Sequence, residues 1–269
     1  MRYFSGRACL KLCRYGEAEK EFRAAVRFRP RFWLAGCHLA ETLVCLGRPG
    51  GSAAIFERLA RALPEVRAEL LAWHGETLLW MGRWREALVK LSDAVEAGSW
   101  LAVCWRGAAN VIGGRHAQAL RDLDRATMPG SRDGEAYIWR GELLRRMGRR
   151  SEAMADLDRA VALGDPVWSR WNRALLHAQK GDMASMRADF AALSPGLIAA
   201  VERRLGSSGS SSRSDAERVR LLEGGLSLAF GVRRSDPYLQ RIWMEDGPRR
   251  AVLGLERRRR PAPGRETTS

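Results

Sequence analysis

The sequence is poor in lysine, in cysteine and in long apolar runs. Only four of its 46 basic residues are lysines, so arginine supplies nearly all of the formal charge of +15. No uninterrupted apolar run approaches the roughly 18 residues that a membrane span needs. The N-terminal stretch Met1–Arg7 also lacks the apolar core of a secretory signal. These absences favour a cytoplasmic protein that does not enter a membrane.

Patterns that carry chemistry are also missing. The five cysteines are odd in number and include no Cys-x-x-Cys pair, and the four histidines lie far apart. Cys9 and Cys13 share a helix face, but two thiols do not complete a metal site. No phosphate-binding glycine loop occurs, and no Gly-x-Ser-x-Gly elbow. We therefore expect no metal site, no cofactor and no catalytic activity.

The positive charge lies at the two ends of the chain. Residues 1–31 carry nine basic residues against three acids, and residues 201–269 carry fifteen against nine. The long middle is almost balanced. A basic protein attracts nucleic acid, anionic membranes and acidic proteins without specificity. The balanced middle argues against a continuous basic groove that follows a nucleic-acid backbone.

A pattern that returns after 32 and 34 residues is the strongest feature of the sequence. In three stretches a glycine is followed by alanine twelve residues later, by leucine after sixteen and by alanine after nineteen. The alanines at the twelfth position are Ala87, Ala119 and Ala153. A fixed period in this range predicts a solenoid of stacked helical units.

The pattern resembles the tetratricopeptide repeat (TPR), a helix–turn–helix unit of 34 residues. The first unit matches its spacing through Gly6, Ala18, Phe22, Ala25 and Pro30. In the second unit the small residues are read as Ala40, Ala53 and Ala60, with a turn one residue longer than the pattern. The sixth unit is degenerate. The resemblance covers residues 1–206 and implies an all-α, right-handed α-solenoid of about six helix–turn–helix repeats.

Two further expectations concern residues that recur from unit to unit. The glycines between the two helices of each unit are expected to adopt the left-handed conformation that ends a helix. The tryptophans Trp73, Trp105 and Trp139 recur at one repeat position. They form either an aromatic binding ladder or part of the packing, and repeat logic favours packing.

The segments after the array differ in composition. Residues 196–206 are expected to form a helix that caps the solenoid, because its last unit otherwise exposes an apolar face. Residues 207–214 read as a Ser/Gly linker, 215–246 as a short helical segment and 247–269 as a basic, disordered tail. A docking face is expected at Tyr238, Leu239, Ile242 and Trp243. It would dock on the array itself or on a partner.

The family resemblance also implies where a ligand would lie. In this family peptides lie along the concave face made by the first helix of each unit, and the residue after the small position tends to face that groove. By this resemblance the groove residues are Arg7, Glu41, Glu76 and Glu142, with Ala108 and Leu175 at the remaining positions. Three glutamates favour a basic or amphipathic partner segment. Alternatively they pair locally, as Glu142 would with Arg145 or Arg146 one turn on.

The resulting functional hypothesis is a non-catalytic scaffold or adaptor that binds a protein segment in the concave groove. One alternative is an accessory repeat region of a neighbouring or fused enzyme. Another is a helical repeat protein that binds nucleic acid, which only the net charge favours.

Overall fold

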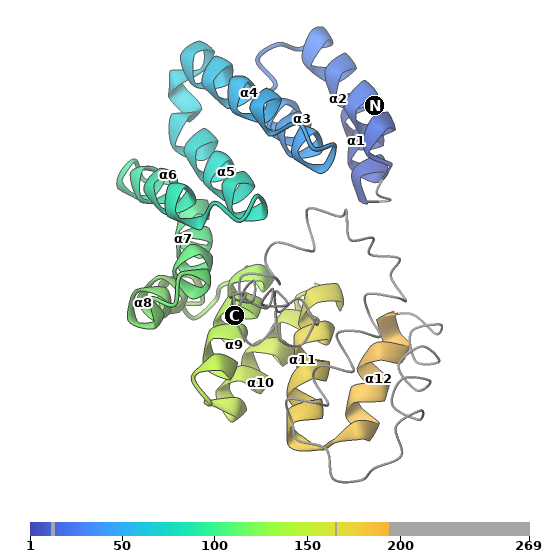
Figure 1. The fold of residues 1–269 in the computed structure, drawn as a ribbon, viewed down its shortest axis with the longest axis vertical. Helices are drawn as coiled ribbons and strands as arrows, with labels where there is room; N and C mark the ends of the chain where they lie inside the picture. The colour runs from blue at the N-terminus through green and yellow to red at the C-terminus, as the bar shows by residue number, and fades with distance from the viewer. Residues whose placement is uncertain (12–13, 165, 194–269) are drawn as a thin grey trace, which may run out of the picture.

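The computed structural model describes residues 1–11, 14–164 and 166–193, and over these residues it is a solenoid of paired helices (Figure 1). Consecutive helices pack against each other, and the described residues contain no strand. This confirms the expected all-α repeat architecture. The helices are α1 (Arg2–Lys11), α2 (Tyr15–Phe28), α3 (Trp33–Cys45), α4 (Pro49–Ala62), α5 (Arg67–Trp80), α6 (Trp84–Glu96), α7 (Leu101–Ile112), α8 (His116–Ala126), α9 (Gly134–Arg146), α10 (Arg150–Ala162), α11 (Pro166–Lys180) and α12 (Met183–Leu193), with a 3-10 turn η1 (Pro64–Val66) before α5.

The odd-numbered helices form the concave side of the array. The first helix of a unit packs against the first helix of the next unit: α3 against α5, α5 against α7 and α7 against α9. Among the described helices no comparable packing joins α4 to α6 or α6 to α8. Helices that pack more closely from unit to unit lie on the inner side of a curved array, and here these are the first helices of the units. We call the side formed by α1, α3, α5, α7, α9 and α11 the inner face.

Each unit keeps one internal spacing. The second helix begins nine residues after the small residue of the first helix, as α8 does after Gly107 and α10 after Gly141. In the second to sixth units the turn between them uses a glycine seven residues after the small residue. These glycines have φ between 70° and 78°, as expected for a left-handed helix end. They are Gly47, Gly82, Gly114, Gly148 and Gly181.

The second unit obeys the same spacing, so the expected longer turn is wrong. α4 begins at Pro49, nine residues after Ala40. At the positions that other units fill with small or branched residues, the structure buries Ser52, Phe56 and Leu59. Ala53 and Ala60 are only partly buried. Because alanine was preferred at these positions, the sequence analysis placed the repeat pattern of this unit one residue too late.

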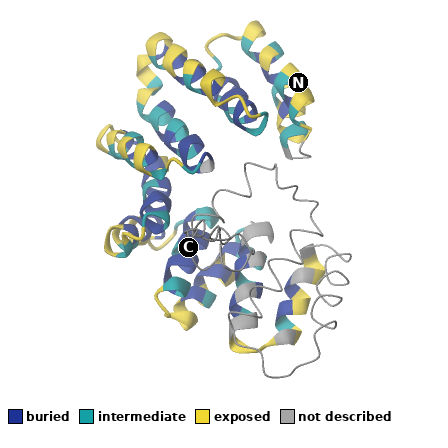
Figure 2. Cartoon of the chain, in the orientation of Figure 1, coloured by how far each residue is buried: buried dark blue, intermediate teal, exposed yellow. Residues whose placement is uncertain are grey.

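The two helices of a unit approach most closely at the small residue. A Cβ atom added to Gly107 would lie 2.7 Å from Cγ of Leu123, which stands sixteen residues later on α8. Gly141 has the same relation to Leu157, at 3.0 Å. Real Cβ atoms essentially never come as close as 2.7 Å and rarely as close as 3.0 Å, so a side chain at either position would force its neighbour to move. Figure 2 shows the consequence, because buried residues line the sides on which paired helices meet.

The recurring tryptophans are packing residues where they are best defined. Trp105 and Trp139 are buried, at 3% and 8% exposure, and belong to the core that runs through the middle units. Trp73 is partly buried and packs against the core of the first units. This agrees with the packing interpretation and not with an aromatic ladder across the three units.

Several expectations concern segments outside the described residues. The capping helix 196–206, the linker 207–214, the segment 215–246 and the tail 247–269 all lie there, so these boundaries stay predictions. Within the described residues, no helix is both long and apolar enough to span a membrane. Cys37 and Cys104 are buried thiols of inner helices.

The third unit carries a histidine where the next two units carry arginine. His74 precedes Gly75 as Arg106 precedes Gly107. Its ring stacks on Phe56 of the second unit, with centroids 4.7 Å apart and planes 5° apart. Burial, and after it the charges of Lys90 and Arg83, lower the pKa of His74 to about 4. The imidazole is therefore neutral in the folded protein at pH 7.

We expect Gly107→Ala to destabilise the protein by about 1–3 kcal/mol, the usual cost of overpacking a filled core. The reason is the contact with Leu123 described above. Gly16→Ala on α2 is the matched control, because an added Cβ there meets nothing within 4 Å. Urea denaturation followed by circular dichroism measures both. Equal stability of the two variants would contradict the close approach.

As the pH is lowered from about 6.5 to 4, we expect the free energy of unfolding to decrease, in part because of His74. The unfolded state binds a proton near the ordinary histidine pKa, whereas the folded state resists protonation down to about 4. The contribution is therefore complete above pH 6.5 and is lost as the pH falls towards 4. Between these pH values the free energy of unfolding of His74→Gln should decrease less than that of the wild type. The difference between the two proteins should be up to about 1.4 kcal/mol for each pH unit. Denaturation midpoints at several pH values test this, and the same pH dependence in His74→Gln and the wild type would contradict it.

Candidate functional site

Two of the predicted groove residues lie together on the inner face. Glu41 is on α3 and Glu76 is at the equivalent position of α5. The thiol of Cys37 is buried on α3, and its pKa is raised first by burial and then by the charges of Glu76 and Glu41. Both carboxylates therefore act electrostatically on one thiol, and the two helices that carry them pack against each other. The Glu41 side chain is 16% exposed, and its Oε2 lies 3.1 Å from Nδ1 of His38.

The negative charge extends to the start of α9 through residues that the sequence did not single out. The pKa of the buried Cys104 thiol on α7 is raised by burial and then by Asp133, Glu135 and Glu76. Asp133 caps α9, because its carboxylate accepts the backbone N–H groups of Glu135 and Ala136 at 3.1 Å. An acid pair at a helix start is the signal that would have revealed Asp133 and Glu135.

Glu142 is placed differently from Glu41 and Glu76. Its side chain is 4% exposed, and its oxygens accept hydrogen bonds from Arg145 and Arg146, each at 2.8 Å. Arg146 also donates to the carbonyl oxygen of Val111 at 3.3 Å. The local pairing at i+3 and i+4 is therefore the arrangement that the structure has. A charge buried under two arginines is not offered to a ligand.

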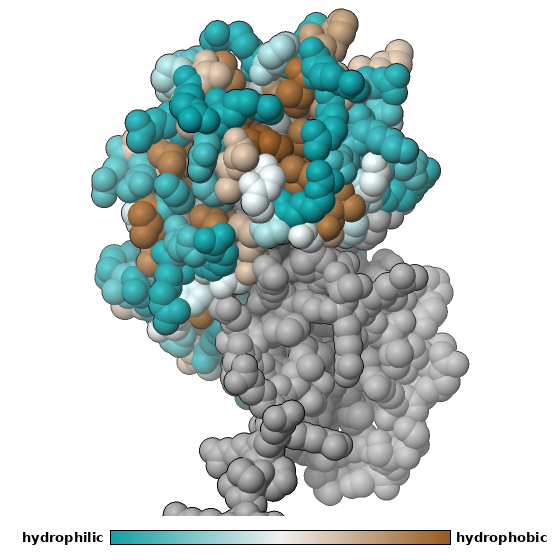
Figure 3. Space-filling view, turned by 45° about the horizontal axis from the view of Figure 1, so that its top comes forward, coloured by the Kyte–Doolittle hydropathy of each residue, from teal (hydrophilic) through white to brown (hydrophobic). Residues whose placement is uncertain are grey.

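A row of rings crosses the inner side of the first three units. The Tyr3 ring on α1 lies 4.7 Å from Phe32 and 5.6 Å from His38 on α3, and His38 lies 5.0 Å edge-on from Trp73 on α5. The guanidinium of Arg7 stands 5.9 Å from the Tyr3 ring, which brings this predicted groove residue to the same region. In the view of Figure 3, hydrophobic side chains gather between hydrophilic ones on the part of the surface described there. Rings and carboxylates together suit a cationic ligand.

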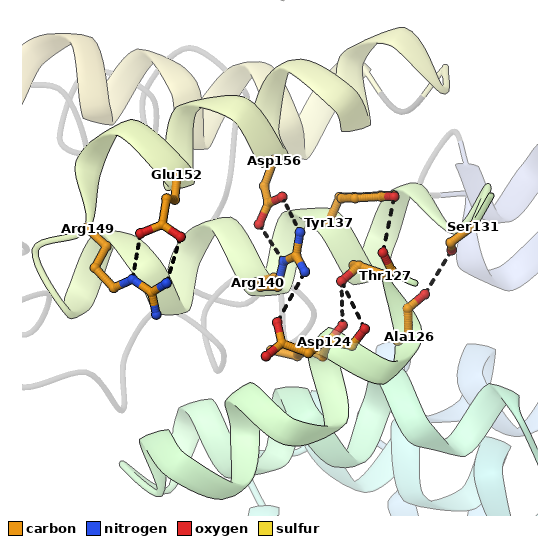
Figure 4. Close-up of polar contacts among 10 residues, drawn as sticks. Asp124, Ala126, Thr127, Ser131, Tyr137, Arg140, Arg149, Glu152 and Asp156 are labelled. Carbon is orange, nitrogen blue, oxygen red and sulfur yellow. Dashed lines mark hydrogen bonds and ion pairs between the residues drawn. The ribbon is translucent and has the colours of Figure 1, made fainter. Parts of the chain in front are cut away.

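A second polar feature joins the later units and was not predicted. In each of these units an arginine before the small residue pairs with an aspartate sixteen residues later. Figure 4 shows the pair of the fifth unit, Arg140–Asp156. Arg140 also pairs with Asp124 of the preceding unit at 3.1 Å. Arg173 likewise pairs with Asp158 at 2.7 Å. We call these pairs the Arg–Asp ladder: they are Arg106–Asp122, Asp124–Arg140–Asp156 and Asp158–Arg173–Asp189.

A cleft of about 240 Å³ opens beside the ladder between units four and five. Its charged groups are already matched, because Arg140 pairs with Asp124 and Asp156 and Arg149 makes a two-point contact with Glu152 (Figure 4). The residues that line the cleft therefore join the fourth unit to the fifth. The lining residues are Leu120, Asp124, Arg140, Leu144, Arg149, Glu152, Ala155 and Asp156.

The remaining predicted positions add little. The side chain of Leu175 and the docking face Tyr238, Leu239, Ile242 and Trp243 lie outside what the structure describes, and Ala108 is buried on α7. Across the described part of the chain, no three His, Cys, Asp or Glu side chains are grouped so that they would hold a metal ion. The inner face at α3 and α5 is thus the best-defined candidate site.

Comparison with known proteins finds a family model that matches one helix pair of the chain. The sequence model of the family described as "Tetratricopeptide repeat" matches residues 134–163, which contain α9 and α10. A TPR protein from Parabacteroides merdae has 16% identity and a TM-score of 0.49, and the match covers 81% of this chain and 92% of that one. The TPR domain of P58(IPK) has 17% identity and a TM-score of 0.31, with 93% and 77% covered. No curated protein matches the chain.

We expect the two aspartates of Arg140 to differ in their effect on stability. Asp156 is 8% exposed and accepts two hydrogen bonds at 2.7 Å, so Asp156→Asn should cost about 1.5–3 kcal/mol. Asp124 is 55% exposed and accepts one, so Asp124→Asn should cost about 0–1 kcal/mol. Chemical denaturation of the two variants measures the difference. A larger loss for Asp124→Asn would contradict the ladder geometry.

Proposed function

We propose that this chain, a member of the tetratricopeptide repeat family, is a non-catalytic interaction scaffold that binds a basic protein segment on its inner face. The binding site consists of α3 and α5, with Glu41 and Glu76 as its charged contacts. The ring row from Tyr3 to Trp73 forms its apolar side. We place this function in the cytoplasm, where the buried thiols Cys37 and Cys104 stay reduced.

The observation that carries the proposal is the equivalent position of two carboxylates on neighbouring inner helices. Glu41 is on α3 and Glu76 on α5, and these two helices pack against each other. An arginine guanidinium binds a carboxylate through two parallel hydrogen bonds and stacks on an aromatic face. The combination of two carboxylates with Tyr3, His38 and Trp73 therefore favours arginine-containing segments over acidic ones.

The contacts of Glu142 support a smaller ligand site than the three glutamates would give. Glu142 is held by Arg145 and Arg146, so neutralising it would leave two arginines without their shared carboxylate. Such a change acts on stability and not on binding. The ligand site therefore includes Glu41 and Glu76 but not Glu142, and it lies in the second and third units.

Binding of a labelled peptide tests the proposal. We expect a dodecapeptide of arginine and leucine to bind the full chain in a fluorescence anisotropy titration, although the chain itself carries +15. The double variant Glu41→Gln, Glu76→Gln should weaken binding about tenfold or more, since a charge-assisted hydrogen bond contributes about 1.5–3 kcal/mol. The control Glu57→Gln, Glu96→Gln removes the same charge from exposed positions of the outer helices and should bind normally.

Two results would overturn the proposal. One is equal loss of binding in the double variant and in its control, because net charge alone would then explain the affinity. The other is a preference for an RNA oligonucleotide over the peptide with a steep salt dependence, because that is the behaviour of a nucleic-acid-binding repeat protein. A control peptide of the same length, made of glutamate and leucine, should not bind to the wild type or to the variants.

A further inference from the structure

The turn inside each of the first five units carries an arginine, and in one unit the partner of this arginine is missing. In the first, third and fifth units the arginine makes a two-point contact with the glutamate three residues later, as Arg83 does with Glu86 at 2.7 and 2.6 Å. In the second unit it pairs with a glutamate of the first unit. The fourth unit has Gln118 at the position of the glutamate, so its turn arginine, Arg115, lacks that carboxylate. The other two-point pairs are Arg14–Glu17 and Arg149–Glu152.

Arg115 lies instead over the ring of Trp84, which belongs to the third unit. The guanidinium carbon of Arg115 is 5.6 Å from the centre of this ring and that of Arg85 is 4.4 Å from it, so the two carbons are at most 10.0 Å apart. Both arginines are exposed, and within the described part of the chain neither forms an ion pair. We call Trp84, Arg85 and Arg115 the Trp84 cluster.

The charge of the Trp84 cluster matches that of one phosphate group. Elsewhere in the array one glutamate takes up one arginine, as in Arg83–Glu86. A phosphate ester carries a charge of about −1.5 to −2 at pH 7 and has three acceptor oxygens, so it takes up two arginines. Each guanidinium presents a planar fork of N–H donors, and small rotations of two long, exposed side chains bring both forks to one phosphate. Arg115 also precedes α8, whose first turn has no acidic residue, so the positive helix end adds to the attraction.

The surroundings of Trp84 favour a phosphorylated protein segment over RNA or a membrane. Proteins that bind single-stranded RNA stack its bases on open aromatic faces. The Trp84 ring is only partly exposed, because it lies against Gly113 and under Arg85. Membrane-binding segments carry about four to eight neighbouring lysines and arginines. Here the adjacent Arg83 is already paired with Glu86, so two arginines are left for one phosphate group.

We propose that Arg85 and Arg115, held on the Trp84 ring, bind a phosphoserine of a partner protein. The site lies at the start of the outer helix α6 and at the turn between α7 and α8. It is separate from α3 and α5, so it does not rest on the function proposed for the inner face. The array then has a second contact, which depends on phosphorylation of the partner.

Binding of a phosphopeptide to the full chain tests the proposal. The probe is a fluorescein-labelled dodecapeptide of glycine and alanine with one central phosphoserine, titrated by fluorescence anisotropy. The double variant Arg85→Gln, Arg115→Gln should weaken binding about tenfold or more, because charge-assisted hydrogen bonds to the phosphate are lost. The control Arg58→Gln, Arg159→Gln removes the same charge from exposed positions of the outer helices and should bind like the wild type.

The variant Gln118→Glu tests the same site without removing an arginine. It restores the glutamate of the other units, so we expect it to pair with Arg115 as Glu86 pairs with Arg83. Phosphopeptide binding should then weaken about two- to fivefold, as expected for competition by an exposed ion pair, while the denaturation midpoint should not fall. The control Ala54→Glu adds the same charge at an exposed position of α4 and should bind like the wild type.

Four results would overturn the proposal. The first is absence of phosphopeptide binding to the wild type, and the second is unchanged binding in Gln118→Glu. The third is equal loss in the double variant and in its control, or equal affinity for the peptide with glutamate in place of phosphoserine, because charge alone would then explain the binding. The fourth is tighter binding of an RNA oligonucleotide, or of vesicles that contain a phosphorylated phosphatidylinositol, with the same dependence on Arg85 and Arg115.

Discussion

The close approach of the two helices in each unit is the constraint on which the rest of the array depends. A glycine or alanine on the first helix makes room for one large side chain of the second helix, sixteen residues later. Because this contact fixes the distance between the helices, it also fixes the nine-residue interval to the second helix and the left-handed glycine before it. Units of equal shape then stack with their first helices together. The inner face is a consequence of that stacking.

Neighbouring units are joined by two kinds of contact. In the first three units rings meet across the seams, as Tyr3 meets His38 and Phe56 meets His74. In the last three units the Arg–Asp ladder links each unit to the next. The ladder uses its carboxylates to hold arginines of the array itself. The proposed partner site lies where the seams are made of rings, on α3 and α5.

The sequence predicted the features that a local contact repeats in every unit. The small residues, the turn glycines and the buried leucines follow from packing at fixed spacings, and the structure places them as expected. The second unit was misread because serine and leucine replace alanine at Ser52 and Leu59, and composition outweighed spacing. The ladder was missed because its partners are sixteen or more residues apart and each charge looks solvated on its own helix. Whether Glu142 paired locally or faced the groove depended on side-chain packing, which no sequence pattern fixes.

The central claim is that a basic segment binds to α3 and α5 on the inner face. Hydrogen–deuterium exchange of the full chain, with and without the arginine–leucine dodecapeptide, tests it most directly, because it reports every helix in one experiment. The account predicts slower exchange in α3 and α5 with little change in the outer helices α4 and α6. Protection confined to the outer helices, or to the cleft between units four and five, would contradict it.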